Sequence, residues 1–197
     1  MISWFFIGLV ITILLTPGPT NTLLASSGIQ VGLRKSLLLI PAEAIGYILA
    51  ISAWGMLIGK VSATLPLLPT FLKLLSAGYI LFLAFKLWRT ANQEVVLNQP
   101  TIRPRELLCA TLLNPKALLF ASAIFPTAAW KSQEIYVVHM SSFVGMILPI
   151  ALFWISVGAV LATNKVKWLS QAKLQRTASV VLVSFAIPIS YSALINL

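Results

Sequence analysis

The sequence predicts an all-α membrane protein with six transmembrane helices arranged as two inverted three-helix repeats. Three observations lead to this fold class: the composition, the number of long apolar stretches, and the proline motifs that break the first and fourth of these stretches. Of the 197 residues, 59% are hydrophobic and only 9% are charged, so the charged exterior of a soluble domain of this size is missing. We therefore expect a single transmembrane domain over residues 1–197.

A transmembrane helix needs roughly 20 apolar residues to cross the hydrocarbon core of a bilayer. The six expected spans cover residues 3–26, 37–59, 66–88, 107–129, 135–162 and 177–196. The first stretch lacks the basic start and the cleavage site of a signal peptide, so we expect it to be retained. The polar segment 89–106 is expected to be a linker between halves 1–90 and 105–197.

Basic residues are distributed unevenly between the loops on the two sides of these spans. Only Lys60 and Lys131 fall in the loops of one side. The other side carries ten, which are Arg34, Lys35, Lys86, Arg89, Arg103, Arg105, Lys165, Lys167, Lys173 and Arg176. The positive-inside rule therefore predicts that the ten lie in the cytoplasm and that both termini lie outside it.

Each half begins with a span that proline interrupts near its middle. The first break is TPGP at residues 16–19 and the second is NPK at residues 114–116, with Pro17 and Pro115 98 residues apart. Three spans are an odd number of crossings, so the second half enters from the opposite face and any repeat is inverted. Paired interruptions at corresponding positions indicate a midplane binding site. A single proline would indicate an ordinary kink, but two matched breaks beside polar residues favour the site.

Both breaks have the form of helix starts. Thr16 before Pro17, and Asn114 before Pro115, match an N-cap followed by proline at the first helical position. The first N–H groups of such half-helices lack intrahelical partners and carry the positive end of the helix dipole. Two of these ends meeting at the midplane would suit a carboxylate.

The residues around the first break support a binding role. Gly18 removes a side chain where a substrate would approach the backbone, while Pro17 and Pro19 stiffen the break. Asn21 adds hydrogen-bonding groups just beyond the break.

Two ionisable residues are expected at membrane depth, Glu43 about 9 Å and Lys116 about 14 Å from the cytoplasmic ends of their spans. A lone charge in a bilayer costs several kcal/mol, so such residues are by default paired or functional. We expect the two side chains to meet, with Glu43 as the proton-coupling candidate and Lys116 as the partner of a substrate carboxylate. The alternatives are a carboxylate in a hydrated vestibule for Glu43 and a snorkelling side chain for Lys116.

Other kinds of chemistry find little support in the residues. His139 is more often a satisfied or interfacial imidazole than a proton relay, and it has no second His, Asp or cysteine pair with which to hold a metal. Cys109 is the only cysteine, which excludes an intrachain disulfide. The sequence contains no Ser-His-acid set or HExxH motif, so we expect neither an enzyme nor a cofactor. The loop bias explains the net charge of +10, so no nucleic-acid partner is expected.

Three motifs carry a family resemblance. Residues 16–36, TPGPTNTLLASSGIQVGLRKS, run from the first break into a Gly-x-Arg-Lys turn. Together with LKLLSAGYILFLAFKLWR at 72–89 and LLNPKALLFASAIFP at 112–126, they resemble the first, third and fourth spans of the LysE-type (LysE/RhtB) family of bacterial amino-acid exporters. The specific motifs cover residues 4–130. The sequence departs from the family at Pro41-Ala42-Glu43, where many members have a Gly-containing apolar stretch, and in the last span, which lacks the usual glycines.

The resemblance implies export of an amino acid or close derivative across the bacterial inner membrane, driven by proton antiport. The expected partners are the amino acid, protons and the lipid bilayer, and a homo-oligomer is compatible with the sequence. The alternative is a non-transporting membrane scaffold or assembly subunit, which would require neither the paired breaks nor Glu43. The implied substrate-site residues are Thr16, Pro17, Gly18, Pro19, Asn114, Pro115 and Lys116, and Asn21 is added from its position.

Overall fold

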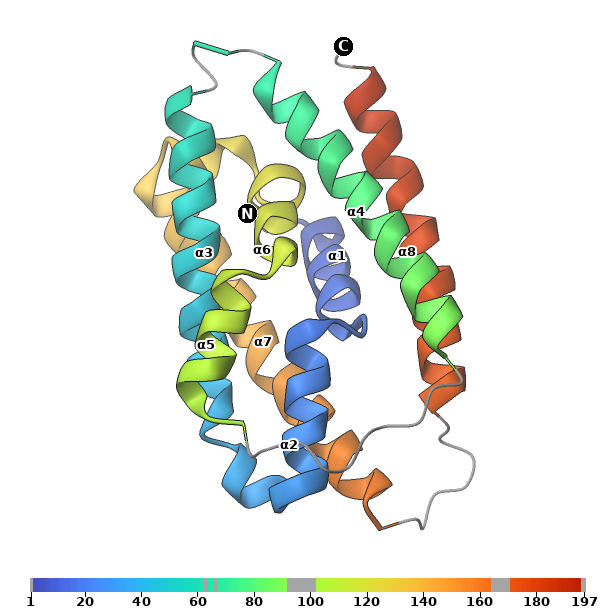
Figure 1. Cartoon of the computed structure of the whole chain (residues 1–197). Helices are drawn as coiled ribbons and strands as arrows, with labels where there is room; N and C mark the ends of the chain where they lie inside the picture. Colours follow the sequence, from blue (N-terminus) through green and yellow to red (C-terminus); the bar gives the residue numbers. More distant parts are fainter. Residues whose placement is uncertain (1, 62–63, 66, 92–101, 164–170, 196–197) are drawn as a thin grey trace.

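The computed structural model describes residues 2–61, 64–65, 67–91, 102–163 and 171–195, and the regular elements within these ranges are helical (Figure 1). In chain order they are α1 (Trp4–Leu15), α2 (Pro19–Ser36), α3 (Leu39–Val61), α4 (Leu68–Thr90), α5 (Pro104–Leu112), α6 (Pro115–Leu119), the π-helical turn η1 (Phe120–Ile124), the 3-10 turn η2 (Thr127–Trp130), α7 (Gln133–Leu161) and α8 (Gln171–Leu194). The all-α class is confirmed.

The two predicted breaks interrupt their helices as expected. The pair α1 and α2 is bent by 55°, and α5 is bent by 46° against the segment Pro115–Ile124. Among the described residues, α3 and α7 are each long and apolar enough to cross a membrane, and the two bent pairs raise the number of candidate spans to four. The full set of six spans and the inverted repeat therefore remain predictions.

Two predicted boundaries are wrong. The loop expected between residues 26 and 37 is mostly helical, because α2 continues to Ser36 and is bent inside by Gly32, whose φ of 76° suits a residue without a Cβ. The expected linker 89–106 is shorter than predicted, since α4 ends at Thr90 and α5 begins at Pro104. At the start of α5, within the predicted linker, the backbone N–H of Arg103 donates to the carboxylate of Glu106 at 3.0 Å. Linker residues 92–101 lie outside the described part of the chain.

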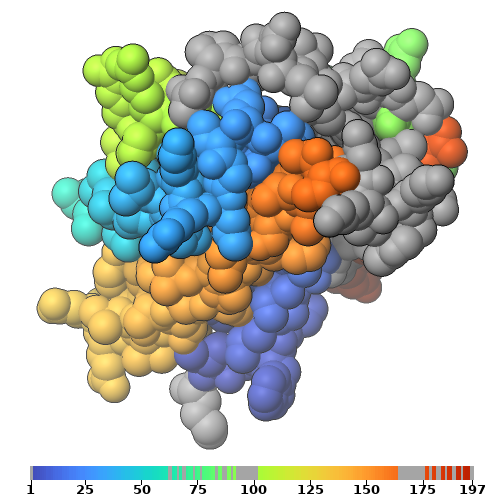
Figure 2. Space-filling model, turned by 90° about the horizontal axis from the view of Figure 1, so that it is seen from below, coloured from blue at the N-terminus to red at the C-terminus, as the bar shows by residue number. Residues whose placement is uncertain are grey.

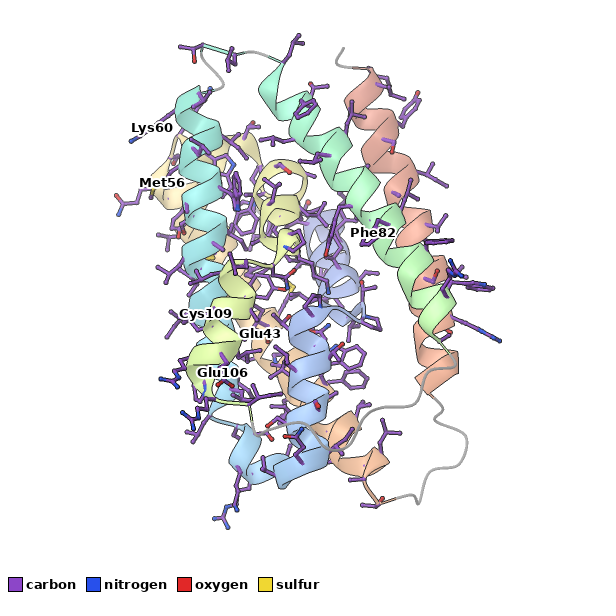
Figure 3. All side chains as sticks on the ribbon, in the orientation of Figure 1. Glu43, Met56, Lys60, Phe82, Glu106 and Cys109 are labelled. Carbon is purple, nitrogen blue, oxygen red and sulfur yellow. The ribbon has the colours of Figure 1, made fainter. Side chains whose placement is uncertain are left out.

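Several helix ends lie together at one end of the molecule. The α2–α3 junction, the end of α4, the start of α5 and the end of α7 lie at one end of the molecule (Figure 1). Figure 2, which looks at this end, shows the α2–α3 junction between the start of α5 and the end of α7. Lys60 lies at the opposite end (Figure 3). The described helix ends that flank the predicted basic loops therefore lie on a common side.

Small residues bring four helices into close contact in two pairs. A Cβ atom on Gly28 of α2 would meet the backbone carbonyl of Ile155 in α7, and one on Gly158 of α7 would meet the carbonyl of Ala25 in α2. Between α3 and α5, a Cβ atom on Gly46 would lie 2.6 Å from the Cβ of Thr111. In membrane proteins, such small residues let helix backbones approach and pack. The second half of the first broken span, α2, is therefore packed on α7, and the first half of the second, α5, on α3.

Candidate functional site

The first break ends one helix before it begins the next. Thr16 is the C-cap of α1, and its backbone N–H donates to the carbonyls of Thr12 and Ile13 at 3.1 and 3.3 Å. Gly18 is the N-cap of α2, with Pro19 at the first helical position and no side-chain cap. The prediction that Thr16 and Pro17 begin the second half-helix is therefore wrong by two residues.

The carbonyl oxygens at the end of α1 receive side-chain donors from two directions. The amide of Asn21 donates to the carbonyls of Leu14 and Thr16 at 2.6 and 2.8 Å. The ammonium of Lys116, which comes from the other broken helix, donates to the carbonyls of Ile13 and Thr16 at 3.0 and 2.7 Å. We call the carbonyl oxygens of Ile13, Leu14 and Thr16 the carbonyl cage.

The second break has the geometry that the sequence predicted. The side chain of Asn114 caps α6 by accepting from the backbone N–H of Lys116 at 3.0 Å, and Pro115 takes the first helical position. Its amide nitrogen donates to the hydroxyl of Tyr47 at 3.0 Å and to that of Thr20 at 3.4 Å. Asn114 therefore joins the second break to α3 and to the first turn of α2.

Glu43 completes this polar cluster from α3. Its carboxylate accepts a hydrogen bond from the side chain of Thr20 and interacts electrostatically with Lys116. Glu43 is only 3% exposed and Lys116 only 1%. The carboxylate points toward the interior between α5 and α2 (Figure 3). Glu43 and Lys116 interact through their charges, but among the described residues the ammonium gives its hydrogen bonds to the cage and not to the carboxylate, so direct pairing of the two side chains stays a prediction.

The remaining predicted site residues differ in how deeply they are buried. Pro17 and Gly18 are buried, Pro115 is partly buried, and Pro19 is exposed. A Cβ atom on Gly18 would lie 3.0 Å from both Cε and Nζ of Lys116. In this conformation the side chain of Lys116 therefore lies against the backbone of Gly18, where a substrate was expected.

Two members of the cluster, Thr20 and Tyr47, were missed by the sequence reasoning. Thr20 belongs to the quoted motif TPGPTNT, and as the second helical residue of α2 it faces the same break as Gly18. Tyr47 follows Glu43 by four residues, a spacing that places both side chains on one face of a helix. Both signals were present in the sequence.

A run of aromatic contacts connects Tyr47 of the polar site to Phe6, which lines a cavity near the start of α1. Neighbouring rings of this run have centroids 4.8–5.8 Å apart, from Phe6 through Phe125 and Phe143 to Phe120 and Tyr47. The cavity, of about 400 Å³, is lined by Ser3, Phe5, Phe6, Glu134 and His139 among others. His139 packs edge-on against Phe6 with centroids 4.9 Å apart, and its Nδ1 lies 2.8 Å from the carbonyl of Ile135.

Comparisons with known proteins agree with the resemblance in the motifs. The family model of the LysE type translocator matches residues 11–193. An uncharacterized membrane protein of Vibrio cholerae serotype O1 is 32% identical over 120 residues, which cover 57% of this chain and 57% of that protein. No solved structure matches the chain.

Proposed function

The chain belongs to the LysE type translocator family, whose members are membrane transporters and not enzymes, and from this premise we propose that it exports an amino acid or close derivative. We further propose that transport runs from the cytoplasm across the bacterial inner membrane in exchange for protons. In this proposal the chain spans the membrane six times as two inverted repeats, with both termini outside the cytoplasm.

The observation that carries the proposal is the meeting of the two breaks inside the protein. Lys116 reaches from the second break to the carbonyls of Ile13 and Thr16 at the first. Thr16 and Asn114 are each only 3% exposed. Helix ends carry unsatisfied backbone groups that are costly in a bilayer, so two ends buried together are expected where they line a site.

The starts of α2 and α6 differ in how well they can bind a substrate carboxylate. The start of α2 has no side-chain cap, so the N–H groups of its first turn and the positive end of its dipole favour a carboxylate. At the start of α6, Asn114 already accepts from the backbone N–H of Lys116. We therefore assign the substrate carboxylate to the first turn of α2. The proposed substrate-binding residues remain Thr16, Pro17, Gly18, Pro19, Asn21, Asn114, Pro115 and Lys116.

Glu43 is the proposed proton-coupling residue. It is a carboxylate buried at a membrane helix, where ionisable groups are retained for pairing or transport. Its neighbours are the side chain of Thr20, the charge of Lys116 and the hydroxyl-bearing Tyr47. Protonation of the carboxylate would cancel its attraction for Lys116, so the protonation state of Glu43 and the position of the lysine are linked.

The test compares two glycines of the first broken span. Gly18→Leu introduces a side chain against Lys116, whereas Gly8→Leu adds one where nothing lies within 4 Å. Cells that carry either variant or the parent at equal expression are fed dipeptides that load each amino acid in turn, and the amino acid released to the medium is measured. We expect Gly18→Leu to abolish export and Gly8→Leu to retain it. Normal export by Gly18→Leu would contradict the proposed site.

A further inference from the structure

We propose that the carbonyl cage at the end of α1 is an ammonium-binding subsite, which Lys116 fills in this conformation and the substrate's amino group fills during export. The assignment of the substrate to the cage rests on the proposed export function. The binding of a primary ammonium to the cage is a separate matter that can be tested without transport.

The geometry of the cage suits a primary ammonium. Carbonyl oxygens at a helix C-terminus carry partial negative charge, and two of them, from Ile13 and Thr16, accept from Nζ of Lys116 at 3.0 and 2.7 Å. The bare backbone at Gly18 leaves room for Cε and Nζ to reach them. An amino acid presents the same donor group, an ammonium on a tetrahedral carbon.

A structural cap for α1 would not need a lysine. The amide of Asn21, from the adjoining helix, already donates to the carbonyls of Leu14 and Thr16. A buried ammonium in a membrane protein costs several kcal/mol more than a neutral cap, so its presence indicates a site built to hold a cation. Lys116 also lies 100 residues from Thr16 in the sequence, on the other broken helix, and is therefore not a local cap.

The cluster offers Lys116 a second position when the substrate occupies the cage. Of the titratable groups described in and beside the cluster, Glu43 and Tyr47 come from α3, and Tyr79 of α4 acts electrostatically on Tyr47. Among the described residues, Glu43 is the one whose charge acts on the lysine. Movement of the ammonium toward Glu43 leaves one cation in the cage before and after the exchange. The site thus avoids a stage at which the carbonyls are buried without a donor.

This inference and the sequence-based role of Lys116 predict opposite results for Lys116→Met. If the lysine binds the substrate carboxylate, its removal weakens substrate binding. If it is an internal competitor for the cage, its removal strengthens the binding of amines, because a site that is rarely free binds with an apparent affinity reduced by the free fraction. Methionine has a similar length and no charge.

The experiment measures thermal unfolding of the purified full chain in detergent, followed by tryptophan fluorescence, with methylammonium chloride as the probe. Tetramethylammonium chloride is the matched salt, because it carries the same charge but has no N–H to donate. We expect methylammonium to stabilise Lys116→Met with a half-saturating concentration at least about tenfold below that of the parent. Lys116→Arg, which keeps a cation, should behave like the parent.

Gly18→Ala provides a second variant that keeps the lysine. Its added Cβ would lie 3.0 Å from Nζ, so the ammonium has to shift by a few tenths of an ångström. This shift should weaken its hold on the cage, and methylammonium should bind more tightly than to the parent. If neither Lys116→Met nor Gly18→Ala gains affinity, or if tetramethylammonium stabilises them equally, the cage is not an ammonium site. Export by the parent is measured separately. If the variants bind methylammonium more tightly but the parent exports no amino acid, the cage is supported and the proposed function is contradicted. If the parent exports but the variants bind methylammonium no more tightly, the cage alone is contradicted.

Discussion

Asn114 and Tyr47, which are 67 residues apart in the sequence, are joined by a hydrogen bond of 3.0 Å between the amide nitrogen and the hydroxyl. The same asparagine caps α6 through its other amide atom. One side chain thus holds the start of a half-helix and fixes its position against α3. Losing it should affect both the stability of the protein and the shape of the site.

We expect Asn114→Leu to lower the free energy of unfolding by about 2 kcal/mol, because it removes an N-cap and leaves buried donors without partners. Tyr47→Phe removes the hydroxyl contacts with Asn114 and Thr20 but keeps the N-cap, and it should cost about 1 kcal/mol. Denaturant titration of both variants in detergent measures the difference. Equal effects of the two changes would show that the cap contributes nothing. Export should be lost with Asn114→Leu.

Glu43→Gln should uncouple export from the proton gradient while leaving substrate binding intact, because glutamine keeps the shape of a protonated carboxyl but cannot release a proton. The measurement is substrate movement in reconstituted vesicles with and without an imposed pH gradient. Glu106→Gln is the control, since Glu106 is exposed and the glutamine side-chain oxygen can also accept from the backbone N–H of Arg103. If Glu43→Gln responds to the gradient as the parent does, Glu43 is a carboxylate in a hydrated vestibule.

Two glycines of α7 provide a matched test of the helix packing. A Cβ atom on Gly158 would meet the backbone of Ala25, whereas nothing lies within 4 Å of Gly145. Gly158→Ala should therefore destabilise the protein by about 1–3 kcal/mol through overpacking. Gly145→Ala should be neutral or stabilising by up to about 1 kcal/mol, because alanine is the better helix former. Unfolding in detergent compares the two, and a stable Gly158→Ala variant would mean that α2 and α7 are not tightly packed.

The predicted orientation can be tested by labelling single cysteines in a Cys109→Ala background. Ser132 is the N-cap of α7, on the side predicted to be outside, and Asn92 and Ser170 fall in predicted cytoplasmic loops, beyond the described residues. In intact cells an impermeant thiol reagent should modify a cysteine at Ser132 and spare those at Asn92 and Ser170. Labelling of the latter two from outside would reverse the topology.

The positions of the breaks could be predicted from the sequence, because proline and its neighbours act locally. Asn114 before Pro115 gave the correct N-cap. At the first break the same rule chose Thr16, but a helix starting at Pro17 would need Gly18 in a helical conformation, which Pro19 disfavours. Gly18 is in fact extended, with φ −161°, and the helix begins at Pro19. The sequence motif contained this information in its second proline.

The partners of Lys116 could not be predicted in the same way. Its depth and its proximity to Glu43 followed from counting residues along two helices. The carbonyls that hold its ammonium depend on where α1 ends and on how the two broken helices cross, and both are properties of the packed structure. Backbone acceptors also leave no trace in residue types, so the cage has no sequence signature of its own.

The close approach of Gly28 and Gly158 determines which parts of the molecule can shift independently. Helices whose backbones touch cannot slide past one another without first separating, so we expect α2 to move together with α7, and α3 together with α5 through the contact of Gly46 with Thr111. The cage belongs to α1, whereas Glu43 belongs to α3. A shift of α1 relative to the α3–α5 pair would change the distance that the Lys116 side chain has to cover, and the short segment at Pro17 and Gly18, where Gly18 is extended, would be the joint between α1 and α2.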